Sequence, residues 1–454
     1  MDNLIVFVIG FYFLVLLLIG WRARKIRSGE DFVLAGRRIG FSMLIATVVA
    51  TFYGASAVIG GASITYQIGL GVLWFMIPFY LGNIVVILVS PRIKRSNNLT
   101  LPGFLGEFYA SRVVVASSLL LAGLCLIPES IIAGGKIIQL MTPLSLESGM
   151  FLIFAIIVVY TILGGMRSVV ISDLIQFSLM LLALLVLVPY FFMSTNLSFW
   201  KLPHAFWNPF GYLSIQEIFV WCILLFFLPI TCAPLYQRIF ATMNGVSVRK
   251  ALLISLMIWI IIDAIVLSAG LISRINYELA DPDQAIIALA LNRLPKILQV
   301  IFFVGFLSAI MSTGDSFLHS GASSLAYDVY RRISQKKSEI GIVNMSRILV
   351  AVLGIISLLF ALYFKEIVPA LIFTLTVWIS GMLVPTIAAL FHFRLKENAA
   401  LSSIIAGSVT AIFWKFFPLL DVDPLFVGLT FSLISSLTVS LREYLAEIKP
   451  LIEI

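Results

Sequence analysis

Charged residues are scarce in this sequence. Only 11% of its 454 residues are Asp, Glu, Lys or Arg, whereas about 25% is usual in a soluble domain, and 61% are hydrophobic. A chain with so few charges is a poor match for a soluble globule. The composition therefore predicts an all-α membrane protein that crosses the bilayer many times.

Groups suited to catalysis or metal binding are also scarce. The three cysteines and three histidines are scattered and form no ligand cluster. All three cysteines lie in apolar stretches, which indicates packing and not disulfides or a metal centre. No GxxxxGK[ST] phosphate loop or GxSxG nucleophile motif occurs. We therefore expect no enzymatic activity.

What the chain has instead is a series of long apolar runs. A helix needs about 20 residues to cross the hydrocarbon layer. We place about thirteen such helices, at 3–21, 40–66, 70–90, 113–141, 148–164, 169–193, 216–237, 251–273, 297–327, 341–364, 366–391, 399–418 and 424–441. Most of the 30 Lys and Arg residues, Arg238 among them, fall on one side, which predicts N-out and C-in. Basic residues on that side would face anionic lipid, and this role also explains the net charge of +8. No nucleic-acid partner is therefore expected.

Two of these spans contain helix breakers. The second, ATVVATFYGASAVIGGASITYQIG, contains Gly54, Gly60 and Gly61, and the seventh, FFLPITCAPLYQRIFA, contains Pro229 and Pro234. Carbonyls freed by such breaks are tolerated in hydrocarbon only where they line a cavity or find partners. Counted from the second span, these are the first and sixth helices of ten. Interruptions at corresponding positions of two halves indicate an inverted-repeat transporter.

Ionisable side chains inside spans are costly and usually functional. They are Glu129, Lys136, Asp173, Asp263 and Asp315. Glu129 follows a proline at a predicted kink and is a candidate for substrate or ion binding. Lys136 lies near the outer end of its span, where its amine could reach the interface. Asp263 could instead stabilise only a contact between helices.

One span is rich in hydroxyl groups. In FLSAIMSTGDS, the carbonyl of Ala309 and the hydroxyls of Ser312 and Thr313 share one helix face. Neutral oxygens of this kind suit a sodium ion that must also be released, and a broken neighbouring helix could add carbonyls. Alternatively, the hydroxyls bond back to their own helix, or the small residues allow close packing. Together with a broken span, the pattern favours ion binding.

Five stretches, in order along most of the chain, resemble segments typical of the sodium:solute symporter family. They are EDFVLAGRRIGFSMLIATVVATFYGAS (30–56), TLPGFLGEFYASR (100–112), YTILGGMRSVVISDLIQ (160–176), YQRIFAT (236–242) and FLSAIMSTGDSFLHSGASSLAYDVYRR (306–332). The family includes sodium/proline, pantothenate, sialic acid and glucose symporters.

The resemblance implies a fold of the leucine-transporter type, with ten core helices in a five-plus-five inverted repeat. Residues 1–39 would form an extra N-terminal helix and cytoplasmic loop, and 40–193 the first repeat. Residues 194–397 would form the second repeat, and 398–454 two peripheral helices with a short tail. We read the first apolar run as a retained helix and expect the protein to work as a monomer.

The resemblance also implies a sodium site. Its ligands would be the carbonyls of Ala50, Tyr53 and Ala309 and the hydroxyls of Ser312 and Thr313. Some members that bind a second sodium have serine where this chain has Ala309, which argues against a second ion.

Two carboxylates match positions on the family's inner ion path. Asp173 corresponds to a second ion site or to the exit route, and Asp315 to the exit route.

The same alignment of motifs suggests which residues line the solute site. They are Phe52, Ser56, Glu129, Cys232, Tyr236 and Trp378. Proline symporters have aspartate where this chain has Phe52, which argues against proline and favours a small, partly apolar organic solute.

These observations predict a sodium-coupled symporter in the cell membrane that imports such a solute by alternating access. A proton-coupled transporter using Glu129 or Asp263 is the alternative, and a sensor or channel on the same fold is less favoured.

Overall fold

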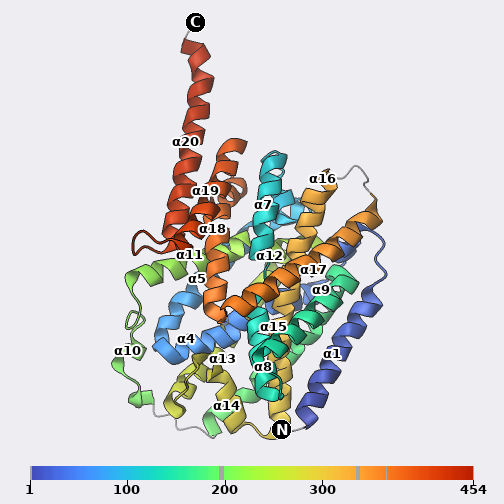
Figure 1. Cartoon of the computed structure of the whole chain (residues 1–454), viewed down its shortest axis with the longest axis vertical. Helices are drawn as coiled ribbons and strands as arrows, with labels where there is room; N and C mark the ends of the chain where they lie inside the picture. Colours follow the sequence, from blue (N-terminus) through green and yellow to red (C-terminus); the bar gives the residue numbers. More distant parts are fainter. Residues whose placement is uncertain (1–2, 194–198, 334–337, 365, 453–454) are drawn as a thin grey trace.

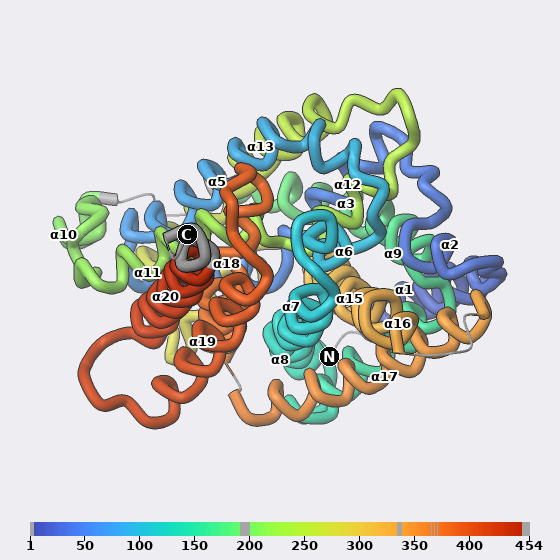
Figure 2. Tube along the Cα trace, turned by 90° about the horizontal axis from the view of Figure 1, so that it is seen from above, coloured from blue at the N-terminus to red at the C-terminus, as the bar shows by residue number. Residues whose placement is uncertain are grey.

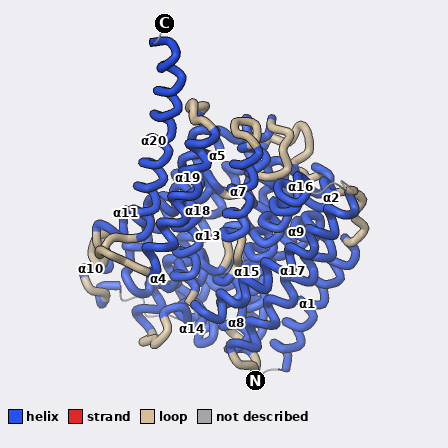
Figure 3. The backbone as a smooth tube through the Cα atoms, turned by 45° about the horizontal axis from the view of Figure 1, so that its top comes forward, coloured by secondary structure: helices blue, strands red, loops and turns tan. Residues whose placement is uncertain are grey.

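The computed structural model describes residues 3–193, 199–333, 338–364 and 366–452, and these residues form helices and loops without strands (Figure 3). The long helices are α1 (Asn3–Ala23), α5 (Leu73–Arg95), α9 (Leu146–Met193), α11 (Ile215–Thr231), α13 (Val248–Asn276), α15 (Lys296–Ser324), α17 (Glu339–Phe364), α18 (Ile367–Phe391), α19 (Glu397–Phe416) and α20 (Pro424–Ile452). The shorter ones are α2 (Gly29–Leu34), α3 (Phe41–Phe52), α4 (Gly61–Ile68), α6 (Leu101–Leu105), α7 (Ser111–Leu124), α8 (Pro128–Met141), α10 (His204–Trp207), α12 (Ala233–Ala241), α14 (Ala285–Arg293) and α16 (Arg331–Ile333).

Within the described residues, eleven helical segments are long and apolar enough to cross a membrane. The most enclosed is α15, with 78% of its most apolar window buried, whereas α1, α17 and α20 have 28%. Seen from above, α19 and α20 lie at one side of the molecule and α1 and α2 at the other (Figure 2). Helix α15 packs between them against α9, α3, α7 and α8, so its hydroxyl-rich stretch is shielded from lipid.

The predicted interruptions in the second and seventh spans are confirmed. Helix α3 ends at Phe52, where Tyr53 has φ −96° and ψ 56°, and a π-helical turn at Ser56–Gly60 leads into α4. Helix α11 ends before Cys232, which has φ −78° and ψ 102°, and α12 starts directly afterwards. The chain is thus broken at both predicted places inside apolar segments.

Three other spans differ from the prediction. The stretch 113–141 is divided, because α7 ends at Leu124 and α8 begins at Pro128. The stretches 148–164 and 169–193 are joined in α9, which turns sharply at Gly165. Gly165 has φ 54°, and a Cβ there would lie 2.7 Å from the Phe32 ring, so the turn requires glycine.

The N-terminal helix starts at one end of the molecule and α20 projects from the opposite end (Figure 1). The number of membrane crossings, the N-out orientation and the boundaries of the two repeats stay predictions.

Candidate functional site

Oxygen atoms of α3 and α15 meet beside the break in α3. The main-chain oxygen of Ala50 accepts hydrogen bonds from Ser312 Oγ at 3.0 Å and from Thr313 Oγ1 at 3.3 Å. The main-chain oxygen of Ala309 accepts from the same two hydroxyls at 2.9 and 3.4 Å. The hydroxyls therefore bond both to their own helix and across to α3. Four of the five residues predicted to bind sodium lie together here.

The fifth, Tyr53, stands at the turn where α3 stops. A Cβ on the next residue, Gly54, would lie 2.3 Å from Thr313 Oγ1, so glycine is needed for α15 to come this close. The Tyr53 phenol donates to Asp263 Oδ1 of α13 at 2.7 Å, and Tyr80 of α5 donates to Oδ2 of the same carboxylate. Asp263 of α13 thus connects the turn, through Tyr53, to α5, through Tyr80.

An ionic network adjoins this oxygen cluster. Arg238 of α12 contacts Asp173 Oδ2 of α9 at 3.0 Å, Thr47 Oγ1 of α3 at 2.8 Å and Ser316 Oγ of α15 at 2.5 Å. Thr47 also donates to Asp173, whose Oδ1 has no hydrogen-bond partner. The network connects four helices, α3, α9, α12 and α15, beside the break.

On sequence alone, Arg238 was counted only as one of the basic residues that set the orientation, but it lies inside an apolar helical segment, Ile215–Ala241. Its side chain is fully buried in α12. The signal that could have found it is its position four residues after Pro234, inside the second half of a broken helix that also carries a family motif.

Asp315 of α15 directly precedes Ser316, a member of the ionic network. It accepts hydrogen bonds from Tyr160 at 2.7 Å and from Ser172 at 3.4 Å, both on α9. Ser316 contacts Asp315 at 3.1 Å and also donates to the main-chain oxygen of Ser312 at 2.6 Å. Ser316 therefore links the ionic network to the oxygen cluster.

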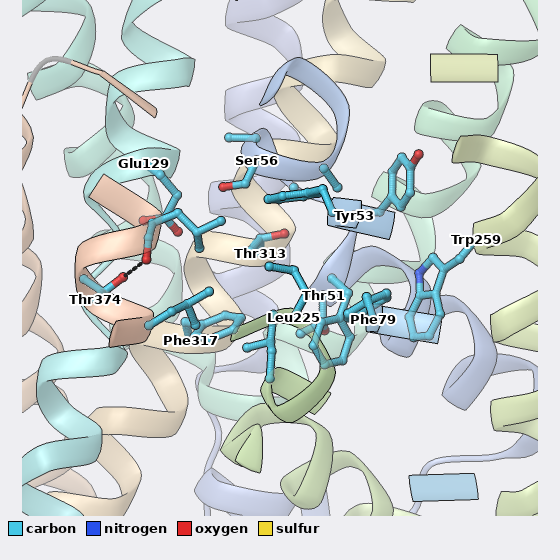
Figure 4. A pocket seen from close by; sticks show the side chains of 18 of the residues that line it. Thr51, Tyr53, Ser56, Phe79, Glu129, Leu225, Trp259, Thr313, Phe317 and Thr374 are labelled. Atoms are coloured by element: carbon cyan, nitrogen blue, oxygen red, sulfur yellow. Dashed lines mark hydrogen bonds between the residues drawn. The ribbon is translucent and has the colours of Figure 1, made fainter. Parts of the chain in front are cut away.

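A cavity of about 90 Å³ opens beside the α3 break, which is room for several water molecules. Thr313 and Gly54 line it, so it borders directly on the oxygen cluster. Glu129 lies on one side, and Phe79 and Trp259 lie on the other (Figure 4).

Three of the six residues predicted for the solute site, Phe52, Ser56 and Glu129, line this cavity. Sequence reasoning missed the aromatic residues contributed by other helices, namely Phe75, Phe79, Trp259 and Phe317. In a sequence with 36 phenylalanines, nothing distinguishes these from lipid-facing rings.

The other three, Cys232, Tyr236 and Trp378, do not line it. Cys232 is buried at the break of α11. The Tyr236 phenol donates to the Ile230 carbonyl at 3.0 Å, and Trp378 Nε1 donates to Thr231 Oγ1 at 3.0 Å. They stabilise the second break and do not border the cavity.

Lys136 also differs from its predicted surroundings. Its amine contacts Asp283 at 2.6 Å and Asp281 at 3.1 Å, in the loop before α14. The amine therefore pairs with two carboxylates of the protein.

Comparison with known proteins identifies the class. The sequence model of the sodium:solute symporter family matches residues 32–407, so the chain belongs to this family. It is a sodium-coupled secondary transporter of small solutes in the plasma membrane, and not an enzyme.

Similar proteins of known name include proline transporters. The osmoregulated proline transporter OpuE of Bacillus subtilis is 24% identical over 90% of this chain and 88% of its own length. The high-affinity proline transporter PutP of the same organism is 26% identical over 88% and 89%. A sodium/proline symporter of Staphylococcus aureus is 25% identical over 89% and 85%.

The fold is found in solved transporters. A substrate-bound, outward-open Na⁺-coupled sialic acid symporter superposes with a TM-score of 0.81 over 96% of each chain, at 19% identity. MhsT in complex with L-phenylalanine superposes with a TM-score of 0.53, at 11% identity, over 88% of this chain and 97% of MhsT. The predicted leucine-transporter type of fold is confirmed.

Proposed function

We propose that the coupling sodium ion binds between α3 and α15, held by Ala50, Tyr53, Ala309, Ser312 and Thr313. The observation that carries this proposal is that the Ala50 oxygen accepts hydrogen bonds from both hydroxyls of α15. Oxygens 2.9–3.4 Å apart are also spaced as neighbouring ligands around one small hard cation. On binding, the ion would replace the hydroxyl protons as the partner of the two carbonyls.

This position supports coupling of ion and solute movement. An ion shared by α3 and α15 favours the conformation in which the two helices touch, and its loss permits them to separate. Thr313 belongs to both the oxygen cluster and the cavity wall, so solute and ion would stabilise the same arrangement. Asp173 and Asp315 lie next to the cluster and would mark the route of the ion to the cytoplasm. Because Arg238 already pairs with Asp173, we do not propose a second sodium there.

The solute would occupy the cavity at the break. The relatives named above are proline transporters, but here Phe52 stands in the cavity wall among apolar side chains. We therefore propose a small, partly apolar organic solute. Since one chain contains the whole site, we also propose that a monomer suffices for transport.

The test is sodium dependence. Purified protein should gain thermal stability from NaCl and not from KCl of equal ionic strength, because an ion that binds only the folded state stabilises it. Thr313→Ala should raise the sodium concentration for half-maximal effect by about tenfold or more. Thr410→Ala is the matched control, because its hydroxyl bonds only within α19, to the Ala406 and Gly407 carbonyls. Equal stabilisation by sodium and potassium would refute the site.

A further inference from the structure

We propose that the solute of this symporter is a small organic ammonium ion, whose positive charge pairs with Glu129 and whose apolar part lies against an aromatic wall. This substrate class rests on the proposed function of the cavity and narrows it.

The charges of the cavity wall point to a cation. Among the described residues that line the cavity are two carboxylates, Glu129 and Asp263, and no Lys, Arg or His. Both oxygens of Asp263 already accept phenol hydroxyls, from Tyr53 and Tyr80. Glu129 is 7% exposed, and its Oε2 has no hydrogen-bond partner. A buried carboxylate oxygen without a partner is costly, and a bound ammonium group would remove that cost.

Local structure explains why Glu129 is available. The chain leaves helical geometry after α7, and Glu129 stands in the first turn of α8, where it faces the cavity from the side opposite Phe79 and Trp259 (Figure 4). Lys136, the other ionised group of α8, is held at Asp281 and Asp283 and is not among the cavity-lining residues.

The opposite wall suits the rest of such a molecule. Phe52, Phe79 and Trp259 form a cluster with ring centroids 5.3 to 5.5 Å apart. Aromatic rings attract ammonium groups and the polarised methyl groups of quaternary amines, while also accepting alkyl chains. A sugar or another polyhydroxylated solute would find few hydrogen-bond partners on this wall.

The proposed sodium site would place a second positive charge beside the cavity. Thr313 lines the cavity, so a cationic solute and the sodium ion would share one low-dielectric region and repel each other. The charge of Glu129 offsets this repulsion. A carboxylate on the solute would add a negative charge beside Glu129 with no basic side chain in the wall to receive it.

The experiment compares charged ligands with neutral ligands of the same shape. Melting temperatures of the purified full chain, in saturating NaCl, are measured against choline and 3,3-dimethylbutan-1-ol, and against 3-methylbutylamine and 3-methylbutan-1-ol. L-proline is the zwitterionic probe. At least one ammonium should bind about tenfold or more tightly than its neutral partner, and also more tightly than proline. Glu129→Gln should remove that preference while keeping the shape of the side chain. Glu217→Gln, an exposed position at the start of α11, should retain it.

The outcomes separate this inference from the proposed sodium site. If no ammonium binds better than its neutral partner, if proline binds more tightly, or if Glu129→Gln keeps the preference, the inference is wrong. Stabilisation by sodium that Thr313→Ala weakens would leave the proposed function intact in that case. An ammonium preference in a protein that sodium and potassium stabilise equally would support the inference and count against the sodium site.

Discussion

Two polar regions lie side by side in the centre of this protein, and they are built differently. The oxygen cluster of Ala50, Ala309, Ser312 and Thr313 contains only neutral groups joined by hydrogen bonds of 2.9 to 3.4 Å. The neighbouring network has a fully buried ion pair, Arg238–Asp173, at 3.0 Å. Ser316 is hydrogen-bonded to both.

The difference reflects what each region has to do. Neutral oxygens hold a cation without binding it so tightly that it cannot leave, and they can return to hydrogen bonding with one another afterwards. A buried ion pair cannot be opened at low cost, because each partner would be left as an uncompensated charge. We infer that the ion pair holds α9 and α12 together, whereas α3 and α15 can separate when the proposed sodium ion leaves.

The largest effect should come from breaking the ion pair. Arg238→Met leaves Asp173 buried without its charge partner, and removing one member of a buried pair costs about 3–5 kcal/mol. We expect a strongly lowered melting temperature at every sodium concentration. The double variant Arg238→Met/Asp173→Asn should recover part of the loss. Equal melting temperatures for the single and double variants would contradict a structural role for the pair.

A smaller effect, confined to the oxygen cluster, should follow from Gly54→Ala. Its Cβ would lie 2.3 Å from Thr313 Oγ1, and overpacking of this kind costs about 1–3 kcal/mol. Because the strain pushes α3 and α15 apart, sodium should stabilise the variant less than the original protein.

The control for this substitution is Gly123→Ala in α7. No atom would lie within 4 Å of the new Cβ, so we expect unchanged sodium binding and equal or higher stability. If both variants respond to sodium alike, close contact at Gly54 does not define the site.

The smallest effect should come from the ion pairs near α14. Lys136 is 16% exposed and its partners Asp281 and Asp283 are 38% and 13% exposed, so water reaches these pairs in part, whereas the Arg238–Asp173 pair is fully buried. Lys136→Met should cost about 0–1 kcal/mol, read as a small shift in melting temperature. A loss as large as that of Arg238→Met would show that burial does not separate the two kinds of ion pair.

The sequence predicted well wherever the signal was local. Glycine and proline located both helix breaks, and one helix face brought together Ala309, Ser312 and Thr313. It predicted poorly where partners are distant in the chain. Arg238 was counted only as a basic residue that sets the orientation, because nothing in its neighbourhood shows that Asp173, 65 residues earlier, is its partner. Cys232, Tyr236 and Trp378 were assigned to the solute site, but they stabilise the second break.

Composition, periodicity and helix breakers by themselves determined that this chain is a helical membrane protein with two interrupted spans and a hydroxyl-bearing helix. These properties depend on neighbouring residues and on the transfer of side chains into lipid, so the order of residues suffices. Only the tertiary structure decided which carboxylates are paired. Asp173 pairs with Arg238 and both oxygens of Asp263 accept phenol hydroxyls, whereas Oε2 of Glu129, like Oδ1 of Asp173, has no hydrogen-bond partner. That depends on how separate helices pack, which no local pattern specifies.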